Sequence, residues 1–223
     1  MHRNINCPAK VSVMKKIFLL GDSIRAGYDK YIKRSLVNVA EVYYPEENCR
    51  FTTYLMRALN GYRKKLGITE LDLIHWNVGL WDNLVMQDGK NLVSIDTYGE
   101  NIDRLCNIFK TVFPGAKMIF ATSTPVQEEL YGDFKRYNRD IEAYNEVAVK
   151  IVKSYGGEIN DLYKLLEGAP SSYHSDATHY YTREATELIT NQVLNSIENT
   201  LGIKGQRLDF DALFEEEKNI VGI

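Results

Sequence analysis

Two short polar motifs that lie far apart in the sequence contain the residue types of a nucleophilic site. The first, Gly21-Asp22-Ser23, follows an apolar run of strand length, and the second, Asp176-Ala177-Thr178-His179, precedes a segment with helical periodicity. A serine hydroxyl becomes a nucleophile when a histidine takes its proton, and a carboxylate holds that histidine in the right tautomer. Ser23 as nucleophile, His179 as base and Asp176 as orienting partner would meet this requirement.

Each motif taken alone also has a purely structural explanation. Asp and Ser are common helix N-caps, and a cap after a strand is the more frequent explanation of Gly21-Asp22-Ser23 by itself. In the second motif Asp176 or Thr178 could cap the following helix, which would leave His179 as a surface histidine. The combination favours catalysis, because loops at the ends of two parallel strands can face each other at one edge of a sheet.

The residues around Ser23 lack the motifs of other nucleophile and phosphate sites. Neither G-x-x-x-x-G-K-[ST] nor G-x-G-x-x-G follows the apolar run, and the serine does not lie in G-x-S-x-G. A flavodoxin-like nucleotide binder would need a phosphate loop here, and only Gly21 and Gly27 support one. This alternative is the weakest.

Two further loops offer groups that could stabilise a negative charge on a substrate oxygen. Asn77 and Gly79 follow an apolar strand, where an amide can donate to an oxyanion and a glycine lets the backbone approach the substrate. Arg50 lies at the start of a predicted helix, where backbone N–H groups are unpaired and the helix dipole is positive. The structural alternative is an Asn/Gly turn with Trp76 and Trp81 in the core.

Apolar periodicity predicts five strands that alternate with helices. We expect strands at residues 16–20, 36–44, 71–76, 117–122 and 156–161, and helices at 52–64, 97–113, 134–155 and 182–201. This order predicts a parallel sheet with right-handed crossovers and helices on both faces. The expected fold is a doubly wound, five-stranded α/β fold, that is, a three-layer α/β/α sandwich.

Composition limits the classes of partner. The chain has 223 residues, of which 44% are hydrophobic, enough for one well-buried core. A net charge of −3 gives no field that would attract nucleic acid or an anionic membrane, and no apolar run is long enough to span a bilayer. Cys7, Cys49 and Cys106 show no paired spacing, and the N-terminal segment has no secretion signal, so we expect a cytoplasmic protein. The histidines His2, His75, His174 and His179 form no ligand-like cluster with carboxylates, which predicts no metal and no other cofactor.

The motifs at the strand ends, in this order, resemble the sequence blocks of the SGNH, or GDSL-type, hydrolases. The resemblance covers roughly residues 15 to 202, and its strongest parts are Gly21-Asp22-Ser23 and Asp176-Ala177-Thr178-His179. The segments TSTPV (122–126) and INDLY (159–163) support it. Two blocks depart from the family pattern. Cys49 and Arg50 are the candidates for the position of a usual glycine, and Asn77-Val78-Gly79-Leu80 stands where the family usually has G-x-N-D.

The resemblance implies an esterase with a Ser23-His179-Asp176 triad and an oxyanion hole formed by the Ser23 N–H, a backbone N–H near Arg50 and the Asn77 amide. It also implies an SGNH hydrolase domain over residues 15–203, between an N-terminal extension (1–14) and a C-terminal appendage (204–223). We expect the appendage to pack on the body or on a second copy of the chain, or to be disordered.

The expected substrate is a short acyl ester, in particular an acetyl ester, of a carbohydrate or small metabolite. Trp81 and Tyr131 are available to stack on a sugar ring. Two alternatives stay open: a lysophospholipase or thioesterase of the same family, and an inactive binding protein with the same fold.

Overall fold

The computed structural model describes residues 14–217, so His2, Cys7 and nearly all of the predicted N-terminal extension lie outside the described part. Five parallel strands form one sheet in the order β2-β1-β3-β4-β5. Their bounds are β1 (Lys15–Leu20), β2 (Ala40–Tyr43), β3 (Leu73–Trp76), β4 (Lys117–Ala121) and β5 (Glu158–Asn160). The expected doubly wound α/β fold is confirmed.

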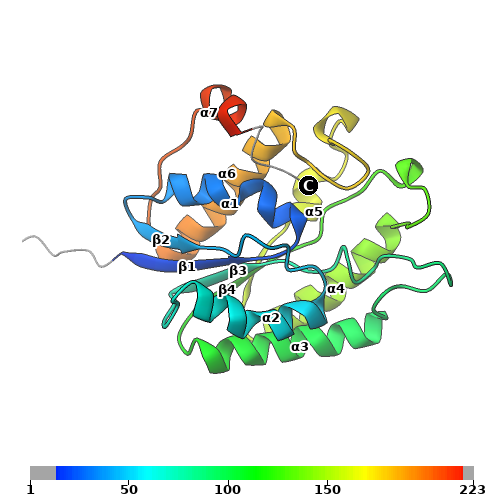
Figure 1. Ribbon diagram of the computed structural model, residues 1–223, viewed down its shortest axis with the longest axis horizontal. Helices are drawn as coiled ribbons and strands as arrows, with labels where there is room; N and C mark the ends of the chain where they lie inside the picture. The colour runs from blue at the N-terminus through cyan, green and yellow to red at the C-terminus, as the bar shows by residue number, and fades with distance from the viewer. Residues whose placement is uncertain (1–13, 218–223) are drawn as a thin grey trace, which may run out of the picture.

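Helices cover both faces of the sheet (Figure 1). On one face lie α1 (Ser23–Ser35), α5 (Leu162–Leu166), α6 (Arg183–Leu201) and α7 (Phe210–Glu217). On the other lie α2 (Thr52–Lys65), α3 (Ile95–Val112) and α4 (Asn138–Ser154). Two short 3₁₀ helices, η1 (Glu128–Leu130) and η2 (Ser171–Tyr173), lie in the connections around the carboxyl ends of the strands.

The two faces carry separate hydrophobic cores because successive strand residues point in opposite directions. In β1, Ile17 and Leu19 enter the core beneath α1 and α6, whereas Phe18 and Leu20 enter the core beneath α2 and α3. All four side chains are fully buried. This explains why the strand reads as a continuous apolar run rather than an alternating one.

Two predicted boundaries differ from the structure more than the others do. Residues 36–39, predicted as the start of the second strand, form the turn after α1, where the Val39 N–H donates to Leu36 O (2.9 Å). The fourth predicted helix begins at Asn138 rather than residue 134, because Lys135 forms an antiparallel bridge with Val85. The bridge joins the loop after β3 to the loop after β4.

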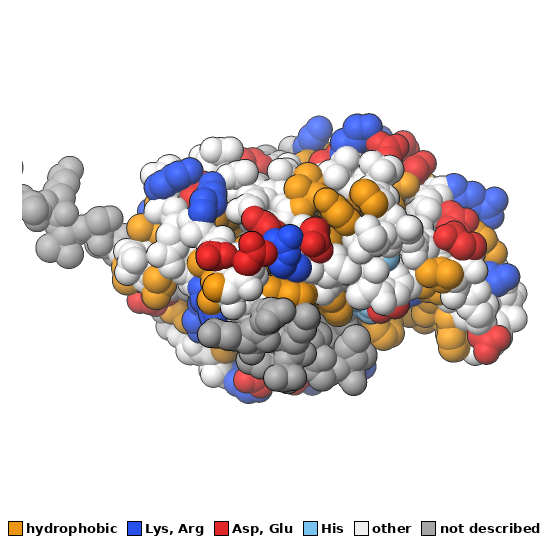
Figure 2. All heavy atoms as spheres, turned by 90° about the horizontal axis from the view of Figure 1, so that it is seen from above, with side chains coloured by type: hydrophobic (Ala, Val, Ile, Leu, Met, Phe, Trp, Pro, Cys, Tyr) orange, Lys and Arg blue, Asp and Glu red, His pale blue; other side chains and the backbone are white. Residues whose placement is uncertain are grey.

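The described part of the C-terminal appendage packs on the body of the same chain. Glu198 on α6 accepts hydrogen bonds from the Gly205 N–H (2.8 Å) and from Arg207 (2.9 Å). Beyond it, Phe210 of α7 is buried, with its ring 4.9 Å from that of Tyr31 on α1. Figure 2 views this face from above and shows acidic and basic side chains side by side rather than a patch of one sign.

Within residues 14–217, the structure contains no helix that combines the length and the apolarity needed to cross a membrane.

Candidate active site

Ser23 is the first residue of α1, directly after the loop that leaves β1. The helix cap predicted at this motif is Asp22, whose Oδ1 accepts a hydrogen bond from the Ile24 N–H (2.9 Å). Because Asp22 caps the helix, the Ser23 hydroxyl is left to contact another part of the chain.

The structure brings Ser23, His179 and Asp176 together in a line. The Ser23 Oγ lies 2.7 Å from His179 Nε2, and His179 Nδ1 lies 2.7 Å from Asp176 Oδ2. With the Nδ1 proton directed at the carboxylate, Nε2 carries the lone pair that can accept the serine proton. The loop that carries both residues lies directly before α6, as the sequence predicted.

Asp176 is held by more than His179. Its Oδ1 accepts hydrogen bonds from the Thr178 N–H (2.7 Å) and the His179 N–H (2.8 Å). Partial burial acts to raise the pKa of Asp176, but these bonds and the bond from the imidazole outweigh it and leave the pKa below its ordinary value. Asp176 is therefore a carboxylate at neutral pH.

Asn77 lies beneath the nucleophile loop and bonds to Asp22. Its Nδ2 donates to Asp22 Oδ1 (2.8 Å), and both side chains are buried. Gly21 is required by this packing, since a Cβ there would lie 1.9 Å from Asn77 Oδ1. One amide hydrogen of Asn77 is thus used to hold the carboxylate next to Ser23, and its service in an oxyanion hole stays a prediction.

Arg50 has the backbone conformation that usually belongs to glycine, with a φ of 53°. Of the two candidates for the family's glycine position, it is the one with this geometry. Its N–H donates to Asn48 Oδ1 (2.7 Å), and the Cys49 N–H donates to Gly21 O (2.9 Å). Both backbone donors have partners inside the protein, so the part of Arg50 in oxyanion binding also stays a prediction.

A buried arginine, Arg25, binds the backbone of the loop between β2 and α2. Arg25 on α1 is 1% exposed, pairs with Asp29, and donates to Pro45 O (2.9 Å) and Glu47 O (2.7 Å). The sequence analysis did not single out Arg25. A buried arginine is rarely left unpaired, but nothing in its sequence position shows that it binds the backbone of a loop some 20 residues away.

Asp82 is another buried carboxylate, and the sequence analysis did not select it. Its Oδ1 accepts hydrogen bonds from the Thr52 hydroxyl (2.6 Å) and the Thr52 N–H (3.1 Å), which ties the loop after β3 to the first turn of α2. Burial raises the pKa of Asp82 to about 7, against the opposing effect of the Thr52 bonds. The sequence signal that could have indicated Asp82 is an acidic residue directly after Trp81, in the loop that follows a predicted strand.

The two predicted substrate residues lie in the loops after β3 and β4. Trp81 is half-buried. Tyr131 bonds through its hydroxyl to Thr178 Oγ1 (2.5 Å), one residue before His179, and its ring lies 5.7 Å from the Arg136 guanidinium. Arg136, which the sequence analysis did not select, also donates to Leu80 O and so links both loops.

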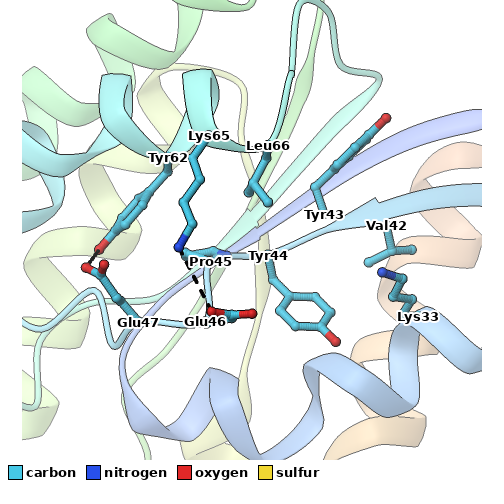
Figure 3. Close-up of a pocket in the computed structure, with 10 residues that line it drawn as sticks. All are labelled: Lys33, Val42, Tyr43, Tyr44, Pro45, Glu46, Glu47, Tyr62, Lys65 and Leu66. Carbon is cyan, nitrogen blue, oxygen red and sulfur yellow. Dashed lines mark hydrogen bonds and ion pairs between the residues drawn. The ribbon is translucent and has the colours of Figure 1, made fainter.

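A cavity of about 250 Å³ lies elsewhere, between edge strand β2 and the end of α2 (Figure 3). Tyr44, Tyr62 and Leu66 line it, and its acidic residues are engaged: Glu47 accepts from the Tyr62 hydroxyl (3.3 Å) and Glu46 pairs with Lys65 (4.0 Å). Neither Ser23 nor His179 borders this cavity. In the described part of the chain, no three His, Cys, Asp or Glu residues are grouped to hold a metal ion.

Comparison with solved structures identifies the fold. A lipase/acylhydrolase from Enterococcus faecalis matches with a TM-score of 0.68 and 19% identity, covering 88% of this chain and 100% of that one. An acetyl xylan esterase matches with a TM-score of 0.65 and 14% identity, covering 82% and 99%. The chain has the fold of the GDSL-type hydrolases.

A catalytic mutant of an acetylxylan esterase from Geobacillus stearothermophilus shares this GDSL-type fold, with a TM-score of 0.61, 13% identity and coverage of 85% of this chain and 96% of that one. No protein-family model and no curated protein matches the sequence. Within the GDSL-type fold of this chain, Ser23 and His179 come from the two sequence motifs on which the resemblance rested.

Proposed function

We propose that the protein is an SGNH, or GDSL-type, ester hydrolase in which Ser23, His179 and Asp176 form a catalytic triad. The observation that carries the proposal is the line of two 2.7 Å contacts from Ser23 Oγ through the His179 imidazole to Asp176. Nucleophile, base and orienting carboxylate within hydrogen-bond reach form the arrangement that activates a serine.

Each half of the reaction uses His179 once as a base and once as an acid. In acylation, His179 Nε2 takes the proton of Ser23, Oγ bonds to the acyl carbon, and the leaving alcohol departs with that proton. In deacylation, His179 takes a proton from water, the resulting hydroxide attacks the acyl carbon, and Ser23 Oγ leaves with the proton. Asp176 stabilises the imidazolium that forms in both halves.

The oxyanion of each tetrahedral intermediate needs donors in addition to the triad. We propose the Ser23 N–H, a backbone N–H near Arg50 and the second hydrogen of the Asn77 amide. Asn77 supports this through its position next to Asp22, the neighbour of Ser23. Loss of one such donor typically costs about 10²–10³ in kcat.

A short acyl ester of a carbohydrate or small metabolite is the substrate class we favour. Two of the structures with the same fold are, by their descriptions, acetyl xylan esterases. Trp81 is half-buried and belongs to the loop that Arg136 ties to Tyr131. Because one face of the Tyr131 ring is near Arg136, Trp81 is the better candidate to stack on a sugar.

One observation favours the alternative of a longer acyl chain. Leu130 and Phe134, on either side of Tyr131, are 59% and 43% exposed. Apolar side chains that stay exposed beside a site can bind an aliphatic chain. This arrangement supports a lysophospholipase or thioesterase as the second candidate.

We also propose that the enzyme works in the cytoplasm on a small-molecule ester. Cys49 and Cys106 are both buried free thiols. Unpaired cysteines are typical of a reducing compartment.

The test is a series of p-nitrophenyl esters from acetyl to decanoyl, together with acetylated xylo-oligosaccharides, each assayed with wild type and Ser23→Ala. We expect the highest kcat/KM for acetyl esters and a loss of nearly all turnover in the variant. A preference for octanoyl or longer chains would replace the acetyl ester by the second candidate. Activity that persists in Ser23→Ala would contradict the triad, whereas a folded wild type with no activity would favour a binding protein.

A further inference from the structure

One tyrosine outside the proposed triad contacts both of its reacting members. The Tyr181 ring stacks on the His179 imidazole, with ring centres 4.8 Å apart and planes inclined by 19°. The Tyr181 hydroxyl donates to the backbone carbonyl of Ser23 (2.6 Å). A single side chain thus spans from the base to the first turn of α1, which carries the nucleophile.

Helix α1 has a glycine, Gly27, where it faces the Tyr181 ring. A Cβ at Gly27 would lie 2.8 Å from Cε1 of Tyr181. Glycine inside a helix costs about 0.5–1 kcal/mol relative to alanine. Gly27 therefore allows the ring a place between α1 and His179 that no larger residue would leave open.

The ring matters most once Ser23 is acylated. In the free enzyme, the imidazole is held by Asp176 at Nδ1 and by the Ser23 hydroxyl at Nε2. In the acyl-enzyme, Ser23 Oγ is esterified and has no proton to donate, so this second bond is lost. Asp176 and the stacked Tyr181 are then the groups that keep Nε2 directed at the attacking water.

We propose that Tyr181 is a positioning residue that holds the His179 imidazole for deacylation. The inference rests on the proposed esterase function and deepens it. The phenol stays protonated as a donor because burial raises the pKa of Tyr181 well above its ordinary value. It acts through His179, since its hydroxyl bonds to the backbone carbonyl of Ser23 and not to the Ser23 hydroxyl.

The neighbouring residue supplies a matched control. Tyr180 is also a buried tyrosine, its ring lies tilted against a different histidine, His174 (4.0 Å between ring centres), and its hydroxyl donates to Pro125 O (3.0 Å). In neither of these interactions does the Tyr180 side chain contact Ser23 or His179. Its removal should lower stability without a selective effect on one step.

The experiment measures the two halves of the reaction separately with p-nitrophenyl acetate. Release of p-nitrophenolate with enzyme in excess gives the acylation rate, and decay of the acetyl-enzyme by intact mass spectrometry gives the deacylation rate. The variants are Tyr181→Leu, Tyr181→Phe, Gly27→Ala and Tyr180→Leu, with Ser23→Ala as the blank. Gly27→Ala should displace the Tyr181 ring without removing it. This variant therefore tests the same role of the ring if Tyr181→Leu does not fold.

We expect Tyr181→Leu to slow deacylation by about 10–100-fold, the scale of a misplaced catalytic group, and acylation by much less. Gly27→Ala should act in the same direction. Tyr181→Phe keeps the ring and loses one hydrogen bond, so both rates should stay within about fivefold of wild type. Tyr180→Leu should change neither rate per folded molecule.

Three results would overturn the inference. Equal slowing of both steps in Tyr181→Leu, no slowing in Tyr181→Leu or Gly27→Ala, or the same selective effect in Tyr180→Leu would each show that Tyr181 is only a packing residue. In these cases wild type still hydrolyses the ester, and the proposed function stands. A wild type no faster than Ser23→Ala would overturn the proposed function, and this inference with it.

Discussion

His179 depends on Asp176 for its tautomer as well as for its orientation. The carboxylate accepts from Nδ1 (2.7 Å) and from the backbone N–H of the same residue (2.8 Å). An asparagine at this position has the same size but carries no charge and presents only one oxygen. It can neither stabilise the imidazolium nor accept both of these bonds in the present way.

We therefore expect Asp176→Asn to lower kcat by about 10³–10⁴ with little change in KM. Steady-state kinetics on p-nitrophenyl acetate would measure this loss. Glu187→Gln is a control for charge removal nearby in sequence, since Glu187 pairs with Arg183 at the surface (3.4 Å). A kcat for Asp176→Asn within tenfold of wild type would contradict the triad.

At the scale of residues, the sequence predicted the three residues of the proposed triad. It did not predict the residues that hold the triad in position. Ser23, His179 and Asp176 stand out because their types form a known chemical set at strand ends. Tyr181 is one of fifteen tyrosines, and only its contacts with His179 and Ser23 distinguish it. Residues that act by position carry no chemical signature in a single sequence.

At the scale of elements, the turn between β2 and α2 contains the one non-glycine residue with positive φ in the described chain, Arg50. A left-handed conformation costs a residue with a Cβ about 1–2 kcal/mol. The guanidinium also lies over the Tyr54 ring, 4.9 Å from its centre. The backbone conformation of Arg50 therefore destabilises the fold, whereas the contact of its side chain with Tyr54 stabilises it.

Two variants separate these contributions. Arg50→Ala and Arg50→Gly both remove the contact with Tyr54, but only glycine accepts the positive φ without strain. We expect Arg50→Gly to be more stable than Arg50→Ala by about 1 kcal/mol in urea unfolding. Equal stability of the two variants would contradict a strained turn.

The loop after β3 carries a titratable link to α2 through Asp82. Because burial raises the pKa of Asp82 to about 7, the folded chain keeps a proton that the unfolded chain releases near pH 4. The stability that this proton provides is present at low pH and is lost as the pH rises toward 7. Asparagine resembles the protonated carboxyl group and does not titrate.

We expect the unfolding free energy of wild type, relative to Asp82→Asn, to fall by roughly 1–3 kcal/mol between pH 5 and pH 8. Taking the difference removes the effect of other groups, including His75, whose pKa burial lowers to about 3. Urea unfolding of both proteins across this range would measure it. A difference that is constant with pH, or that grows, would contradict the raised pKa.

Elements were predicted where apolar periodicity was strong and missed where tertiary contacts decide the boundary. Strands β1 and β4 and the helices beginning at Thr52 and Arg183 follow their patterns closely. Helix α1 was not placed, although Ile24, Tyr28 and Ile32 recur at helical spacing after the Asp22 cap. The late start of α4 depends on the bridge between Lys135 and Val85, which no local pattern shows.

At the scale of the whole molecule, Glu198 joins the C-terminal segment to the body. Burial acts against its charge, but bonds from Arg207, Lys204 and the Gly205 N–H outweigh burial and lower the pKa of Glu198 to about 2. Its stabilising effect is complete above the ordinary pKa of a glutamate and is lost as the pH falls toward 2. The segment should therefore loosen in acid.

We expect Glu198→Gln to lower the unfolding free energy at pH 7 by roughly 1.5–3 kcal/mol, the scale of hydrogen bonds to a charged group. Trypsin should also cut faster at Lys204 and Arg207. Glu184→Gln is the matched control, because Glu184 pairs with Arg183 at the surface (3.0 Å) and its loss should cost much less stability. An equal loss in both variants would contradict a clamp at Glu198.

The whole account depends on Ser23 being a nucleophile that His179 activates. The most direct measurement is labelling by a fluorophosphonate, with peptide mapping by mass spectrometry, in wild type, Ser23→Ala and His179→Ala. We predict rapid labelling of wild type at Ser23, none in Ser23→Ala and a rate at least about 10³-fold lower in His179→Ala. A folded wild type that is not labelled, or equal labelling in His179→Ala, would contradict the account.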